Sequence, residues 1–190
     1  MKFSRTEIPD VIIIEPSLFG DDRGYFMETI RMDNLNKFLG FEFNFCQENE
    51  SKSGFGVLRG LHFQMPPFCQ TKLVRVTLGK VLDVAVDLRK GSPTFGKHVA
   101  IELSDENRLQ MFVPRGFAHG FVVLSETAIF NYKVDNYYNK AADRGIAFND
   151  PALEINWILK PEQLKLAEKD KKQPLLEHAD IFNFTNDLYV

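Results

Sequence analysis

Residues 72–88 read KLVRVTLGKVLDVAVDL, and this stretch indicates the fold. Polar and apolar side chains alternate along residues 72–78, and a Gly-Lys turn leads into a second apolar segment at residues 81–88. This pattern is typical of a β-hairpin. Because successive side chains of a strand point to opposite faces, Asp83 and Asp87 are expected to face solvent. The inward face is then formed by Leu82, Val84 and Val86.

Further strands are predicted after this hairpin, at residues 98–103, 109–113, 117–124 and 127–134. Clusters of Gly, Pro, Ser, Asp and Asn separate them, as turns require. Many short strands joined by turns favour an antiparallel sandwich or barrel. Short helices are expected only at the periphery, at residues 32–39 and 161–169. We therefore expect an all-β fold.

The composition fits one globular domain over residues 1–190. Hydrophobic residues make up 44% of the chain and charged residues 26%, which is an ordinary balance for a soluble protein. The net charge of -3 and the lack of a Lys/Arg run argue against a nucleic-acid partner. No apolar run is long enough to cross a bilayer, and no secretory signal is recognised, so we expect no membrane partner and a cytoplasmic location. Cys46 and Cys69 lack metal-type spacing and are expected to be reduced thiols.

The segment at residues 56–64, GVLRGLHFQ, places polar side chains inside an apolar strand. If the strand alternates regularly, His62 and Gln64 share one face and Arg59 lies on the other. Burying polar groups costs free energy unless partners are supplied, so the segment has the character of a site wall. The residues alone leave a second interpretation open, in which His62 is a satisfied core histidine beside a surface arginine.

The remaining candidates allow similar pairs of interpretations. His119, followed by Gly120, is either functional or a hydrogen-bonded structural residue, and Tyr132 is either an acid or part of the core. A transition-metal site is disfavoured, because Gln64 stands where a His-x-His pair would need its second histidine. No glycine-rich phosphate loop or nucleophile elbow is present. Bound phosphate would then be held by Arg23, Arg59, Lys72 and Arg115.

Taken together, the motifs resemble those of the dTDP-4-dehydrorhamnose 3,5-epimerase family nearly from end to end. The resemblance rests on their order and spacing, since any one of them alone is weak. The matching segments are DRGYFME (22–28), QEN (47–49), GVLRGLHFQ (56–64), QTKLVR (70–75), DVAVDLR (83–89), SPTFG (92–96), PRGFAHGF (114–121), YK (132–133) and DP (150–151).

The resemblance implies a cupin-like jelly roll that acts, usually as a homodimer, on a dTDP-linked 4-keto-6-deoxyhexose without metal or redox cofactor. The implied reaction inverts C3 and C5 of dTDP-4-dehydro-6-deoxy-D-glucose to give dTDP-4-dehydro-L-rhamnose. An epimerase that inverts only one of these carbons in a related sugar nucleotide is the alternative. Two alternatives belong to other functional classes of protein. They are a non-catalytic sugar-nucleotide binder and a metal-dependent cupin oxygenase.

The resemblance also implies the roles of individual residues. His62 is expected to be the base, oriented and favoured in its charged form by Asp170, while Tyr132 returns a proton from the opposite face and Lys72 lies near the C4 oxygen. Asp143 stands where the family often has glutamate. The residues expected to bind substrate are Arg23, Phe26, Glu28, Gln47, Asn49, Arg59, His119, Tyr138, Asp143 and Lys169.

The chemistry accounts for this set of groups. A C4 ketone acidifies the hydrogens on C3 and C5, because the resulting carbanion delocalises onto oxygen. A histidine with an ordinary pKa of ~6.5 can accept such a proton at neutral pH, and a tyrosine with a pKa of ~10 can donate one. A non-catalytic binder has no need of an opposed base and acid.

Overall fold

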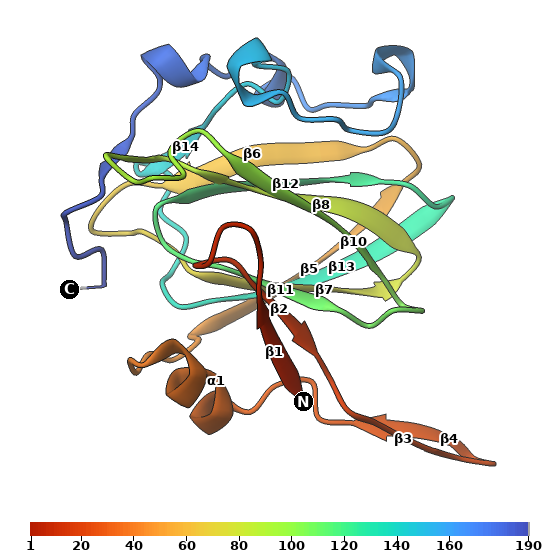
Figure 1. Ribbon diagram of the computed structural model, residues 1–190. Coiled ribbons are helices and arrows are strands. Elements are labelled where there is room, and N and C mark those ends of the chain that lie inside the picture. Colours follow the sequence, from red (N-terminus) through yellow and green to blue (C-terminus); the bar gives the residue numbers. More distant parts are fainter. Residues whose placement is uncertain (190) are drawn as a thin grey trace.

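The computed structural model describes residues 1–189 and consists mainly of two antiparallel β-sheets packed face to face (Figure 1). The six-stranded sheet contains, in spatial order, β1 (Lys2–Arg5), β2 (Ile12–Glu15), β11 (Gln110–Val113), β7 (Lys72–Leu78), β13 (Thr127–Val134) and β5 (Gln47–Gly54). The five-stranded sheet contains β10 (His98–Ser104), β8 (Lys80–Asp87), β12 (Phe117–Val123), β6 (Leu58–Gln64) and β14 (Asp143–Gly145). The predicted all-β fold is confirmed, and the strands expected at residues 72–78 and 127–134 match β7 and β13.

The core between the sheets is built from alternate residues of facing strands. Val81 and Ala85 of β8 pack there with Val74 and Val76 of β7 and with Phe130 of β13. Burying such side chains removes apolar surface from water and is the main stabilising term of the sandwich.

The outer face of the five-stranded sheet is also covered. We call residues 146–189, which follow β14, the C-terminal segment. Leu82, Val84 and Val86 of β8 pack against Trp157 and Phe182 of this segment, which runs across the sheet in blue in Figure 1. The prediction that Asp83 and Asp87 face solvent is therefore wrong, since both side chains are 0% exposed. Because the even-numbered residues of β8 lie under the C-terminal segment, its odd-numbered residues point into the sandwich.

The one α-helix within residues 1–189, α1 (Met32–Leu39), occurs where the sequence predicts it. It ends at Gly40, whose left-handed φ of 85° closes the last turn with a hydrogen bond from its N–H to the carbonyl of Asn36. Leu35 is the buried residue of α1 and packs on Phe112 beneath the six-stranded sheet. None of the helices formed by residues 1–189 has the length and apolar character needed to cross a bilayer.

The prediction of a helix at residues 161–169 is wrong. Only a 3₁₀ turn, η2 (Pro161–Gln163), forms there. Lys165 instead lies beside Val57 in a parallel bridge, donating its N–H to the carbonyl of Gly56 and accepting from the N–H of Leu58. These hydrogen bonds require an extended backbone, so docking onto the start of β6 overrides the local helix signal. The other 3₁₀ turns are η1 (Pro151–Leu153), η3 (Asp170–Lys172) and η4 (Leu176–His178).

Two further sheets in the described part of the chain have two strands each. β9 (Arg89–Lys90) pairs in parallel with β15 (Phe182–Asn183) and fastens the C-terminal segment. β3 (Leu18–Asp21) and β4 (Gly24–Met27) form a hairpin that projects from the body of the molecule (Figure 1). The large apolar side chains of this hairpin are exposed, Phe26 by 65%. We call residues 18–28 the arm.

Candidate active site

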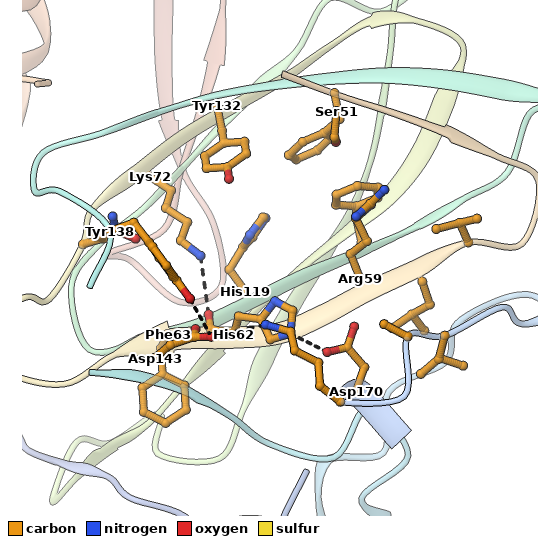
Figure 2. Close-up of a pocket in the computed structure, with 18 of the residues that line it drawn as sticks. Ser51, Arg59, His62, Phe63, Lys72, His119, Tyr132, Tyr138, Asp143 and Asp170 are labelled. Carbon is orange, nitrogen blue, oxygen red and sulfur yellow. Dashed lines mark hydrogen bonds and ion pairs between the residues drawn. The ribbon is translucent and has the colours of Figure 1, made fainter. Parts of the chain in front are cut away.

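A cavity of about 650 Å³ lies between the two sheets. Strands β6 and β12 line it on one side and β7 and β13 on the other, while residues 165–170 of the C-terminal segment close part of its rim (Figure 2). The cavity brings together many of the residues predicted from the sequence. These are Arg59, His62, Lys72, His119, Tyr132, Tyr138, Asp143, Lys169 and Asp170.

His62 and Asp170 form a close pair within the cavity. The Nε2–H of His62 donates to Oδ1 of Asp170 at 2.6 Å, although the residues are 108 positions apart in sequence. Asp170 is buried at the start of η3, while the His62 imidazole is partly exposed to the cavity. With the carboxylate accepting at Nε2, Nδ1 is the ring nitrogen that can take up a proton. The arrangement is thus a buried carboxylate that orients an imidazole with one ring nitrogen free among residues 1–189.

Lys72 reaches the same space from β7 of the opposite sheet. Its Nζ lies 3.5 Å from the backbone carbonyl oxygen of His62. Burial lowers the pKa of Lys72 to about 8, because an ammonium ion is poorly solvated there. The side chain supplies a positive charge close to the proposed base at neutral pH.

Tyr132 lies on β13, on the side of the cavity opposite His62 (Figure 2). Burial raises the pKa of its phenol, and the positive charge of Arg59 only partly offsets that rise. The hydroxyl therefore carries its proton throughout the neutral range. A protonated phenol can serve as an acid toward a group held between the sheets.

A second histidine–aspartate pair lies deeper in the sandwich. The Nε2–H of His119 donates to Oδ1 of Asp83 at 2.9 Å, and both side chains are buried. Burial lowers the pKa of His119 and raises that of Asp83. The other oxygen of Asp83, Oδ2, has no hydrogen-bond partner among the described residues. Asp83 was not among the site residues predicted from the sequence, although an aspartate inside an apolar strand could have been recognised as a candidate.

Arg59 lines the cavity beside His62, so the prediction that it faces the other way is wrong. Between the pairs His119–His62 and Phe121–Arg59, β6 contains one residue more than β12, which makes a β-bulge. Gly60 in the bulge has φ +130°, and a Cβ there would lie 2.5 Å from the Cα of Gly120. The bulge interrupts strict alternation and turns Arg59 toward the cavity, where its Nε donates to Oγ of Ser53.

Polar groups from three segments meet at one end of the cavity. The Nζ of Lys169 lies 3.2 Å from Oδ2 of Asp143, and the Tyr138 hydroxyl donates to the same oxygen at 3.4 Å. The Tyr138 side chain is 57% exposed and leaves much of its ring open to a ligand.

Five predicted binding residues lie outside the cavity lining. Arg23 and Phe26 belong to the arm, and Glu28 follows β4. Gln47 and Asn49 lie on the edge strand β5, where their side chains bond each other. Within residues 1–189, no group of three or more His, Cys, Asp or Glu side chains is arranged to hold a metal ion.

Comparison with known proteins identifies close relatives. A family model described as dTDP-4-dehydrorhamnose 3,5-epimerase matches residues 5–178. The Pseudomonas aeruginosa protein of that name is 52% identical over 96% of this chain and 99% of its own length. The crystal structure of the Elizabethkingia anophelis dTDP-4-dehydrorhamnose 3,5-epimerase has a TM-score of 0.90 at 51% identity, covering 93% of this chain and 97% of its own.

A further solved relative contains a sugar nucleotide. The dTDP-6-deoxy-D-glucose-3,5-epimerase of Legionella pneumophila, in complex with dTDP-4-keto-L-rhamnose, is 44% identical with a TM-score of 0.93. The match covers 97% of this chain and 99% of that one. Together with the sheet topology, these structures confirm the cupin-like jelly roll that the sequence resemblance implied.

Proposed function

The chain belongs to the dTDP-4-dehydrorhamnose 3,5-epimerase family, and we propose that it inverts C3 and C5 of dTDP-4-dehydro-6-deoxy-D-glucose by moving protons next to the C4 ketone. One observation carries the mechanism. An oriented imidazole, His62, and a protonated phenol, Tyr132, face each other across one cavity, with the Lys72 ammonium next to the backbone carbonyl of His62. The product is dTDP-4-dehydro-L-rhamnose.

In the proposed mechanism His62 removes the proton from the carbon next to the ketone. The electron pair of the broken C–H bond forms an enolate, whose oxygen is stabilised by Lys72. Donors of this kind are commonly worth about 3 to 4 kcal/mol of transition-state stabilisation. Tyr132 then donates its proton to the same carbon from the other face. Solvent reprotonates the phenolate and takes the proton from the imidazolium, and the cycle is repeated at the second carbon.

The nucleotide is proposed to occupy the end of the cavity where Tyr138 and Lys169 lie. The open ring of Tyr138 offers a stacking surface for thymine, and Lys169 and Arg59 supply positive charge for the diphosphate. His119 is proposed as a further contact of the nucleotide, made through Nδ1, because its Nε2–H already donates to Asp83. Binding energy from these remote contacts would hold the sugar between His62 and Tyr132.

We further propose a homodimer in which the arm of one protomer completes the cavity of its partner. The support is twofold. Arg23 and Phe26 are expected to bind substrate but do not line the cavity of their own protomer, and the arm exposes a row of apolar side chains that a second copy would cover. A C2 dimer would place two such arms in equivalent positions.

The reaction is tested by incubating the protein with dTDP-4-dehydro-6-deoxy-D-glucose and a 4-keto reductase, then determining the configuration of the product by NMR. We expect a product inverted at both C3 and C5. Inversion at only one carbon would establish the single-centre alternative. Binding without any inversion would overturn the enzymatic assignment in favour of the sugar-nucleotide binder.

The shared site is tested by mixing two variants. In a heterodimer of Arg23→Ala and His62→Ala, one cavity combines an intact His62 with an intact arm from the partner. The His62→Ala variant alone is expected to be inactive. With random mixing, half of the dimers are heterodimers and one of their two cavities is intact, so the mixture should show about a quarter of the wild-type rate. Activity no higher than that of the Arg23→Ala component would contradict the exchange of arms, and sedimentation measures the dimer independently.

A further inference from the structure

The side-chain amide of Gln64 is buried at the end of β6 and bonded on both sides. Its exposed fraction is 3%. Nε2 donates to the carbonyl oxygens of Phe68 at 2.7 Å and Tyr137 at 3.2 Å, and Oε1 accepts the N–H of Asn139 at 2.6 Å. Both amide hydrogens and one acceptor position are thus used, so no part of the group is left unpaired by burial.

Two of these hydrogen bonds bracket Tyr138. The carbonyl bonded by Gln64 belongs to the residue before Tyr138 and the N–H to the residue after it. A neighbouring strand would hold an extended backbone with the same pair of contacts. Among the described residues, the phenol of Tyr138 has a single hydrogen-bond partner, Asp143 at 3.4 Å, a distance that is long for an O–H donor. Gln64 therefore restrains the backbone on both sides of Tyr138, while hydrogen bonds of Asn136 hold the start of the same segment.

Gln64 also lies two residues after His62 on the same strand. The segment that carries Tyr138 and the strand that carries the proposed base are thus joined through one side chain. We propose that Gln64 is a positioning residue, which fixes the Tyr138 ring as the stacking surface for the nucleobase and sets its position relative to His62. This inference deepens the proposed function and rests on it.

A glutamine is the side chain that fits this position. Glutamate would have the same shape, but its carboxylate would face two carbonyl oxygens with no hydrogen to donate. Leucine would leave the carbonyl of Tyr137 and the N–H of Asn139 without their partner, and unpaired buried groups are costly. Either change should make the backbone around Tyr138 more mobile, and the Tyr138 ring with it.

The experiment measures dTDP affinity by calorimetry and steady-state kinetics with the sugar nucleotide for Gln64→Glu and Gln64→Leu. We expect the Kd for dTDP and the KM to rise about tenfold, the effect of about 1.4 kcal/mol, while kcat changes by less than about threefold. A purely structural tether would lower the Tm without this split between KM and kcat.

Asn107 provides a matched control. Its side chain also makes three hydrogen bonds to backbone groups, with Ser104, Leu109 and Glu102, but it lies in the turn between β10 and β11 and does not line the cavity. Asn107→Leu should lower the Tm and leave the dTDP affinity and KM unchanged. If Gln64→Leu does not fold, Gln64→Glu, which keeps the shape of the side chain, gives the same comparison.

A double-mutant cycle tests whether Gln64 acts through Tyr138. We expect Tyr138→Ala to weaken dTDP binding and Gln64→Leu to add little to that loss in the double variant. Additive losses, or wild-type dTDP affinity in both Gln64 variants, would overturn the inference. A wild-type protein that fails to bind dTDP would instead refute the proposed function, so the two failures are distinguishable.

Discussion

His62 and Tyr132 face one cavity from opposite sheets of the sandwich. His62 belongs to β6, which pairs with β12 and β14, whereas Tyr132 belongs to β13, which pairs with β5 and β7. A hexose ring held between the sheets would present one face to the imidazole and the other to the phenol (Figure 2). This opposition is the geometric requirement for inverting a carbon centre by loss and return of a proton.

Asp170→Asn should lower kcat by about 100-fold, within the usual range for impaired acid–base catalysis. The hydrogen bond from Nε2 of His62 would then reach a neutral amide in place of a carboxylate, so the ring loses the charge that stabilises the imidazolium. Steady-state kinetics measures the effect. A variant with wild-type kcat would show that Asp170 has no part in supporting the base.

Activity should fall on the alkaline side near pH 8. Burial lowers the pKa of Lys72 to about 8. A lysine is charged below its pKa and neutral above it, so the ammonium is present at pH 7 and lost as the pH rises. Because kcat/KM reports ionisations of the free enzyme, its pH profile should show this group.

Lys72→Arg serves as the control for that profile. A guanidinium stays charged over the accessible range, so the alkaline decline near pH 8 should disappear even if the rate is lower. The raised pKa of Tyr132 keeps its own ionisation above this region. An alkaline decline that persists unchanged in Lys72→Arg would assign it to another group.

Gly60→Ala should destabilise the protein by about 1 to 3 kcal/mol. A methyl group there would approach the backbone of Gly120 to 2.5 Å, at a φ of +130° that other residues rarely adopt. Gly54→Ala is the matched control, since its nearest neighbour is 3.7 Å away and its φ is not in the left-handed region. Denaturant unfolding of both variants measures the difference, and equal stabilities would contradict the tight approach of the two strands.

Local sequence pattern was sufficient for the strands but not for which of their faces are buried. The strands predicted at residues 72–78 and 127–134 match β7 and β13, because strand-forming pattern and turn residues are local properties of the sequence. Asp83 and Asp87 were placed wrongly because Trp157 and Phe182, from a distant part of the chain, cover the outer face of β8. The sequence of β8 alone does not show that a distant segment covers its outer face.

For the candidate site, the residues could be predicted from the sequence, but the orientation of one of them could not. The motif resemblance named His62, Lys72, Tyr132 and Asp170, and the structure brings all four to one cavity. The orientation of Arg59 could not be predicted, since it depends on a bulge that two glycines permit only when β6 and β12 meet. The roles of these residues, the homodimer, the single-domain organisation and the cytoplasmic location stay predictions.

The central claim is tested most directly by NMR of the sugar after reaction in heavy water. The wild type should place deuterium at C3 and C5 with inversion at both carbons, and His62→Ala should place none. Tyr132→Phe should still exchange hydrogen for deuterium while inversion is strongly impaired, because proton removal survives and delivery to the opposite face does not. Inversion of both centres by Tyr132→Phe at the wild-type rate would contradict the account.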